Sequence, residues 1–297
     1  MNDTMQIKTL KDYLEHVSEK IDTCHHDTRV LLRGHYKHID CPKPTIDRND
    51  VRNRLGFANE VEIANMAHIQ CPELFPMFSE TTAIEVLSKL QHYGAPTRLL
   101  DFTTNMFVAL YFACKCDGDA ENKNGEIIGY VLNRHQENKY EDEDDGYCER
   151  GMPRFTQDMT LMSRLAYWLC TGQNDKVDKK ILGKTIEGSY VNCRDLERPI
   201  FFEAPKYSIR QTIQDGWYAL FPTKPTKDEV RFHETPFLVD LQEPDFRFEI
   251  PAKYKKVLLE KLEILSIDRI HLFPDDLDGV CKSVSEKVAT AWRNLAC

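Results

Sequence analysis

A run of thirteen residues, QHYGAPTRLLDFT at positions 91–103, gathers many of the side chains in this sequence that could do chemistry. Four polar or ionisable side chains, His92, Arg98, Asp101 and Thr103, stand there among apolar residues. A guanidinium binds the paired oxygens of phosphates, a histidine carries protons, and a carboxylate stabilises developing positive charge. We therefore interpret the segment as a candidate binding or catalytic site.

A purely structural interpretation of the same residues stays open. Polar groups in an apolar segment need partners, because an unsatisfied buried donor costs about 1–3 kcal/mol. Arg98 and Asp101 could form a buried ion pair that only organises the turn at Gly94 and Pro96. His92 could be a core histidine at a helix end, bonded to the backbone.

Four blocks of the sequence resemble the FRG domain family, named for a Phe-Arg-Gly that stands here as Leu-Arg-Gly. The blocks are Leu32-Arg33-Gly34, QHYGAPTRLLDFT followed by ALYFA at 109–113, Arg210-x-x-x-Gln214-x-Gly216-x-Tyr218, and LFPDDLDG at 272–279. They run in this order from about residue 30 to about residue 280, so the resemblance spans most of the chain.

The motif order of that family is similar to that of the ADP-ribosyltransferase superfamily, whose members hold NAD in a cleft of a split sheet. The resemblance implies that Arg33 on a first strand, Thr103 with Thr104 on a second, and Gln214 before a third surround NAD. A glutamate is usual at the third place, and this chain has Gln214 followed by Asp215.

The expected reaction explains these residue types. Cleavage of the nicotinamide–ribose bond passes through an oxocarbenium-like centre, which a nearby carboxylate or amide orients and stabilises. Gln214 could bond a ribose hydroxyl, and Asp101 or Glu203 would supply the missing negative charge. His92 would contact the adenosine or carry a proton. We therefore predict the catalytic residues Gln214, Asp101 and His92, and the NAD-binding residues Arg33, Gly34, Arg98, Thr103 and Tyr218.

The elements that must position these residues alternate between helix and strand. Apolar periodicity, capping residues and Gly–Pro breaks predict helices and strands along the whole chain. The first predicted helix begins after Thr9. The other predicted helices cover 59–70, 80–92 with a capping box from Thr82 to Glu85, 106–114, 159–169, 251–265 and 276–295. The predicted strands are 30–32, 127–132, 216–221, 237–241 and 246–250.

This pattern predicts an α+β fold: a mixed split β-sheet around an NAD-type cleft, with flanking helices and a helical C-terminal layer. We expect one domain over 1–297, with a core of about 28–225 and C-terminal strands and helices over 226–297.

Composition narrows the function classes. The chain has 297 residues and a formal net charge of −9, which disfavours binding of nucleic acid by bulk charge. Much of that charge lies in an acidic excursion at 137–149, so the net charge does not exclude a locally basic cleft. The stretch with the strongest local positive charge is 176–184. Neither a signal peptide nor a membrane-spanning run is recognisable, and we expect a cytoplasmic protein.

The spacing of residues in the sequence excludes several kinds of site or makes them weak candidates. The ten cysteines include no C-x₂-C pair, and Cys24-His25-His26 has no second ligand group, so we expect no metal. Walker A, G-x-S-x-G and G-x-G-x-x-G motifs are missing from the sequence.

The expected function is an NAD-dependent ADP-ribosyltransferase-like toxin or antiphage defence effector. It would modify a macromolecule, RNA or protein before DNA, and an antitoxin would be a fitting partner; the defence role is implied by the resemblance alone. One alternative is a non-catalytic FRG module that binds a nucleotide or RNA. Another is a nuclease that holds Mg²⁺ with Asp101, Asp215 and Glu203.

Overall fold

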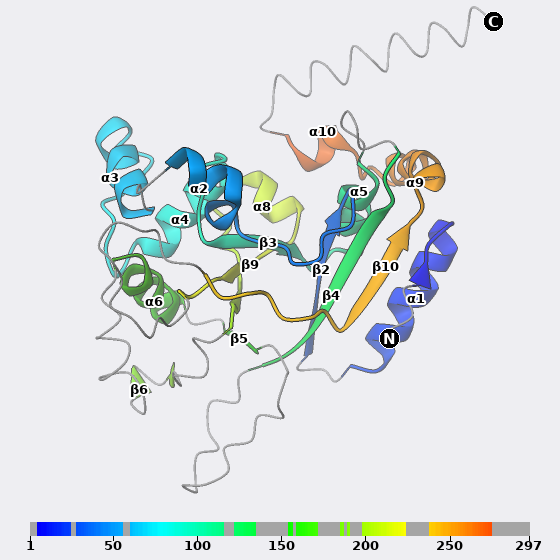
Figure 1. Ribbon diagram of the computed structural model, residues 1–297, viewed down its shortest axis with the longest axis horizontal. Helices are drawn as coiled ribbons and strands as arrows, with labels where there is room; N and C mark the ends of the chain where they lie inside the picture. Colours follow the sequence, from blue (N-terminus) through cyan, green and yellow to red (C-terminus); the bar gives the residue numbers. More distant parts are fainter. Residues whose placement is uncertain are drawn as a thin grey trace, which may run out of the picture.

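The structure of the chain is a computed structural model (Figure 1). It describes residues 5–24, 28–55, 60–115, 122–134, 154–156, 159–171, 185–186, 189–190, 198–223 and 238–274. The predicted acidic excursion at 137–149, the basic stretch at 176–184 and the helix at 276–295 lie outside these residues, as do Asn59 and most of LFPDDLDG.

An eight-stranded mixed sheet forms the centre of the molecule. Its strands lie in the order β1 (Met5–Gln6), β10 (Phe246–Ile250), β4 (Gly125–Arg134), β2 (Thr28–His35), β3 (Leu99–Thr103), β9 (Gly216–Leu220), β8 (Ile200–Glu203) and β5 (Arg154–Thr156). The pairs β1–β10, β4–β5 and β5–β8 are parallel, and the others are antiparallel. The short strands β6 (Thr185–Ile186) and β7 (Ser189–Tyr190) pair separately.

Part of this sheet closes on itself, because β5 pairs with both β8 and β4. The strands β4, β2, β3, β9, β8 and β5 therefore make a ring. Side chains from its inner face form one apolar core, which includes Leu31, Phe102, Tyr130, Phe201 and Trp217. The loop residues Leu238, Val239 and Leu241 complete that core.

Helices cover the other face of the sheet in two groups (Figure 1). One group packs over β10, β4 and β2: α1 (Leu10–Asp22), α5 (Met106–Cys114), α9 (Ala252–Ile264) and α10 (Arg269–Leu272). The other packs over β3, β9 and β8: α3 (Glu60–Gln70), α4 (Ala83–His92) and α6 (Met159–Thr171). Shorter elements are η1 (Thr45–Asp47), α2 (Asn49–Leu55) and α8 (Ile209–Ile213).

Local sequence explains where several helices begin. Thr9 and Asp12 form a reciprocal capping box at α1, and Ser208 and Gln211 form another at α8. The side chain of Asn105 caps α5 by accepting bonds from two backbone N–H groups. These caps satisfy amides that would otherwise lack partners in the first turn.

The sheet is weakly joined between β2 and β3. β2 pairs with β4 at eight positions, whereas it pairs with β3 only at Leu32 and Thr103. Beyond that pair, toward the end of β2 that carries Arg33, no further residues of the two strands are paired. We call this opening the β2/β3 split.

The prediction of an α+β fold with a mixed sheet and flanking helices is confirmed, whereas an NAD cleft stays a prediction. The predicted capping box at α4 is wrong, because the Thr82 side chain makes no capping bond and donates to the Met77 carbonyl. The predicted strand at 237–241 is also wrong over its described part, where Leu238 makes a single bridge to Thr223. No described helix has the length and apolar character needed to cross a membrane.

Candidate functional site

Arg33 lies on β2 at the β2/β3 split and reaches across it. Its Nη1 donates to the main-chain carbonyl of Asp101 on β3, and its Nε donates to Nε2 of His35 at 2.8 Å. These two bonds use two of the five N–H groups of a guanidinium, so three remain without a bond to a described residue. The planar group is thereby held in one orientation.

No carboxylate among the described residues forms an ion pair with Arg33, although the side chain is half-buried. Burial lowers the pKa of the guanidinium, the charge of Asp101 opposes that shift, and the like charge of Arg48 adds to it. Arg48 itself is exposed. A buried cation normally has a charged partner, so Arg33 is suited to an anion from outside the chain.

His35 stands two residues after Arg33 and therefore on the same face of β2. The ring is 6% exposed, and its Nδ1 lacks a hydrogen-bond partner. Glu126 lies directly opposite on β4, with its Oε2 3.8 Å from that Nδ1. Burial lowers the pKa of His35 to about 4, against the opposing effect of Glu126, so the ring is neutral at neutral pH.

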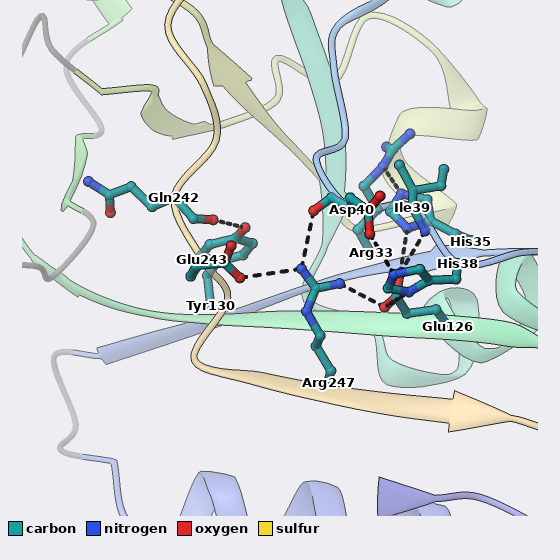
Figure 2. A network of polar contacts seen from close by, with 10 residues as sticks. All are labelled: Arg33, His35, His38, Ile39, Asp40, Glu126, Tyr130, Gln242, Glu243 and Arg247. Atoms are coloured by element: carbon teal, nitrogen blue, oxygen red, sulfur yellow. Dashed lines mark hydrogen bonds and ion pairs between the residues drawn. The ribbon is translucent and has the colours of Figure 1, made fainter. Parts of the chain in front are cut away.

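Glu126 is the centre of a polar network that Figure 2 shows. Its carboxylate accepts bonds from Arg247 Nη1 at 2.7 Å, His38 Nδ1 at 2.8 Å and the backbone N–H of Ile39 at 3.2 Å. Burial raises the pKa of Glu126, but these donors and His35 outweigh it and lower the pKa to about 2. The network ties the loop after β2 to β4 and β10.

Gly34 has a packing role in this structure. A Cβ built on it would lie 1.9 Å from the backbone oxygen of Ala109 in α5. No side chain fits there, so the glycine lets α5 approach β2 closely. This contact accounts for Gly34 without a ligand.

Arg98 pairs with a residue that the sequence interpretation did not consider. Its Nε donates to Glu60 Oε2 at 2.6 Å, and its backbone N–H donates to Glu60 Oε1 at 2.6 Å. Glu60 is 2% exposed and Arg98 5% exposed. The alternative of an Arg98–Asp101 ion pair is therefore wrong, and the Arg98 guanidinium is engaged inside the protein.

Asp101 projects from the helix-covered face of β3, away from the ring core. It is exposed, and its Oδ2 accepts a bond from Gln91 Nε2 at 2.8 Å. Directly opposite on β9 is Tyr218. Asp101 thus presents an accessible carboxylate beside the β2/β3 split, while its own carbonyl receives Arg33.

Thr103 and Gln214 are brought together. The Thr103 hydroxyl donates to the Gln214 carbonyl at 2.6 Å and accepts from the Asn105 N–H at 2.9 Å. The Gln214 side-chain amide donates to the carbonyl of Leu272 in α10 at 2.9 Å. The hydrogen bonds of both side chains therefore join chain segments, and none of them is made to Arg33.

Tyr218 and His92 lie on the same helix-covered side as Asp101. Tyr218 is buried, and its hydroxyl accepts a bond from Gln211 Nε2 at 2.9 Å. Burial raises the pKa of this hydroxyl. His92, at the end of α4, lies 3.4 Å from the Ser208 hydroxyl, measured from Nδ1. The contacts of His92 thus include a side chain from the segment before α8, and the interpretation of a backbone-bonded histidine stays a prediction.

The described residues contain no group of three histidine, cysteine, aspartate or glutamate side chains that could hold a metal ion. Asp101, Asp215 and Glu203, the ligand set of the nuclease alternative, therefore do not form one. Of Cys24-His25-His26, the two histidines lie outside the described residues.

Sequence reasoning missed His35, Glu126, Arg247 and Glu60. One signal for His35 was available, because Leu31, Arg33 and His35 alternate along one predicted strand and so share a face. Glu126 directly precedes the predicted strand 127–132, and Arg247 lies in the predicted strand 246–250. Whether the two side chains meet depends on which strands pair.

Comparison with protein-family models matches residues 28–123 to the FRG domain. The matched stretch runs from β2 through α5 and includes Arg33, the 91–103 segment and Thr103. This finding supports the resemblance to the FRG domain family over that part of the chain. No curated protein and no solved structure matches the chain.

Proposed function

We propose that the protein binds NAD at the β2/β3 split and acts as an ADP-ribosyltransferase-like enzyme. The observation that carries the proposal is Arg33. It is a half-buried, oriented guanidinium with three unused N–H groups and no ion-pair partner among the described residues. Guanidinium forks bind phosphate oxygens in pairs, and the diphosphate of NAD provides them.

The order of the strands agrees with this proposal. The three residues implied by the superfamily resemblance, Arg33, Thr103 and Gln214, stand on or next to the adjacent strands β2, β3 and β9. Thr103 contacts Gln214 directly. Residues about 70 and 180 positions away from Arg33 in the sequence therefore lie on or next to neighbouring strands of one sheet.

Asp101 is the carboxylate best placed to serve the reaction. It is exposed, and its backbone oxygen holds Arg33, but its carboxylate projects from the opposite face of the sheet, so a ligand bound to Arg33 would have to extend through the β2/β3 split to reach it. A carboxylate near the ribose stabilises the oxocarbenium-like centre that forms as nicotinamide leaves. Asp101 would take the charge-stabilising role that Gln214 cannot perform.

One observation favours a second candidate function, a module that binds nucleotide without turnover. The Gln214 amide already donates to the Leu272 carbonyl, so a ribose hydroxyl would have to compete for it. In that case the protein binds NAD or ADP-ribose saturably and releases no nicotinamide.

Titration calorimetry with NAD, combined with an assay of nicotinamide release, tests both candidates. R33A should weaken NAD binding by a hundredfold or more, since a charge-assisted bidentate contact contributes about 3 kcal/mol. R29A is the matched control, because Arg29 lies on the same strand, is exposed and, among the described residues, bonds only the carbonyl of its neighbour Thr28. Equal binding by wild type, R33A and R29A would contradict a nucleotide site at Arg33.

Turnover then separates the two functions. An enzyme releases nicotinamide, and D101A should slow that release at least a hundredfold with little change in NAD affinity. Binding without release supports the non-catalytic module. Folded R33A and Q214A proteins that both turn over NAD at the wild-type rate would overturn the enzyme assignment.

The acceptor and the biological role are tested separately. Labelled NAD incubated with separate RNA, DNA and protein pools identifies the acceptor class, for which we propose RNA or protein. If the protein is a toxin or defence effector, expression of wild type should arrest cell growth and R33A should not. A partner that restores growth in such cells would be the proposed antitoxin.

A further inference from the structure

We propose that His35 is a positioning residue that aims the Arg33 guanidinium at its anionic ligand, with Glu126 holding the imidazole in the required tautomer. The inference rests on the proposed nucleotide site at Arg33 and assigns two residues to it that lie outside every motif discussed above. Both are buried, at 6% and 4% exposure.

The bond between Arg33 and His35 has only one arrangement of protons. Arginine nitrogens donate and never accept, so His35 Nε2, 2.8 Å from Arg33 Nε, must carry a lone pair. The single ring proton is then on Nδ1. A protonated imidazolium would place an N–H against an N–H and destroy the bond.

Glu126 faces the proton-bearing side of the ring. Its Oε2 lies 3.8 Å from Nδ1, and no other group among the described residues accepts from that nitrogen. Arg247, His38 and the Ile39 N–H fix the carboxylate on its other sides. A negative charge at this position favours the proton on Nδ1 and so leaves Nε2 free to accept.

The consequence lies at Arg33. The bond to His35 at Nε and the bond to the Asp101 carbonyl at Nη1 fix the guanidinium plane from two sides. The Nη2 edge is left for the ligand. Without His35 the long side chain regains rotamer freedom, and a ligand must order it again on binding.

The test is a set of NAD titrations with variants at position 35. H35L removes the acceptor and should raise the Kd for NAD about tenfold. H35Q is the conservative variant, because its side-chain oxygen can accept from Arg33 Nε, and it should stay within about threefold of wild type. If His35 had only a structural role, H35L and H35Q of equal thermal stability would not differ in NAD affinity in this way.

The same substitutions in an R33K background check that His35 acts through Arg33. Lysine has no Nε–H group from which His35 could accept a bond, so H35L should add no further loss of NAD affinity to R33K. Additive losses would overturn the inference.

A measurement on the unaltered protein covers the case in which H35L does not fold. Nitrogen NMR of the imidazoles should show His35 with a proton on Nδ1 and an unprotonated Nε2 between about pH 5.5 and about pH 8. A proton on Nε2 would overturn the inference whatever the variants do.

The outcomes distinguish this inference from the proposed function. If R33A binds NAD as wild type does, the nucleotide site at Arg33 fails, and the inference fails with it. If R33A loses binding while H35L keeps wild-type affinity, the nucleotide site stands and only the role of His35 is wrong.

Discussion

Removal of Glu60 should destabilise the protein far more than removal of Asp101, although Asp101 is the acidic residue near Arg98 in the sequence. Glu60 accepts two bonds of 2.6 Å from Arg98, one from Nε and one from the backbone N–H. Both side chains are almost fully buried. E60A leaves that guanidinium uncompensated, which costs about 3–5 kcal/mol. In a chain of this size the midpoint of thermal unfolding should fall by on the order of 10 °C.

D101A is the matched control, since it also removes one carboxylate. Asp101 is exposed and its side chain accepts one bond, from Gln91, so we expect a loss of about 1 kcal/mol or less. Thermal and urea unfolding of both variants give the comparison. The double variant E60L/R98M should recover much of the loss of E60L, because it removes both charges together. Equal destabilisation by E60A and D101A would refute the assignment of the Arg98 partner.

Three further outcomes are expected. G34A should destabilise by about 1–3 kcal/mol or prevent folding, because its Cβ would meet the Ala109 oxygen of α5; urea unfolding measures this. T103V removes the buried donor to the Gln214 carbonyl and should cost about 1–3 kcal/mol in the same assay, whereas a cost near zero contradicts the bond. Acidification should also destabilise the fold: burial lowers the pKa of His35 from 6.5 to about 4, so the unfolded chain takes up the proton first. Stability should therefore fall by up to about 3 kcal/mol as pH drops from about 6.5 to about 4, and H35Q should flatten this slope in urea titrations across that range.

Local patterns were sufficient to predict most helices and several strands. The apolar period after Thr9 gave α1, and the run 106–114 coincides with α5. β10 has the predicted bounds 246–250. These elements were predictable because each displays its buried face in its own sequence, whatever packs against it. β3 was harder, since Leu99–Thr103 carries apolar residues on both faces and follows a Gly–Pro turn without an alternating pattern.

Partner choice could not be predicted. Arg98 had an aspartate three residues away, yet it pairs with Glu60, which lies 38 positions earlier on α3. The Gln214 amide bonds a carbonyl 58 positions later. Such pairings depend on how elements stack in three dimensions, and an isolated polar residue in the sequence shows no preference between two acceptors. Arg33 was recognised as a candidate from the family resemblance, but its acceptor His35 needed the β2 geometry.

The closure of the sheet by β5 bears on how this protein resists self-association through its strands. An open sheet exposes unpaired backbone groups at both ends and can recruit a strand from another chain. Here β5 bonds β8 and β4 at once, so the far end of the sheet has no unpaired border of the usual kind. The remaining border is β1, which is two residues long and offers a partner strand very little to pair with. At its two ends the described main sheet therefore gives foreign β-strand addition only a very short template, and its longer unpaired edges lie inside the sheet, at the β2/β3 split.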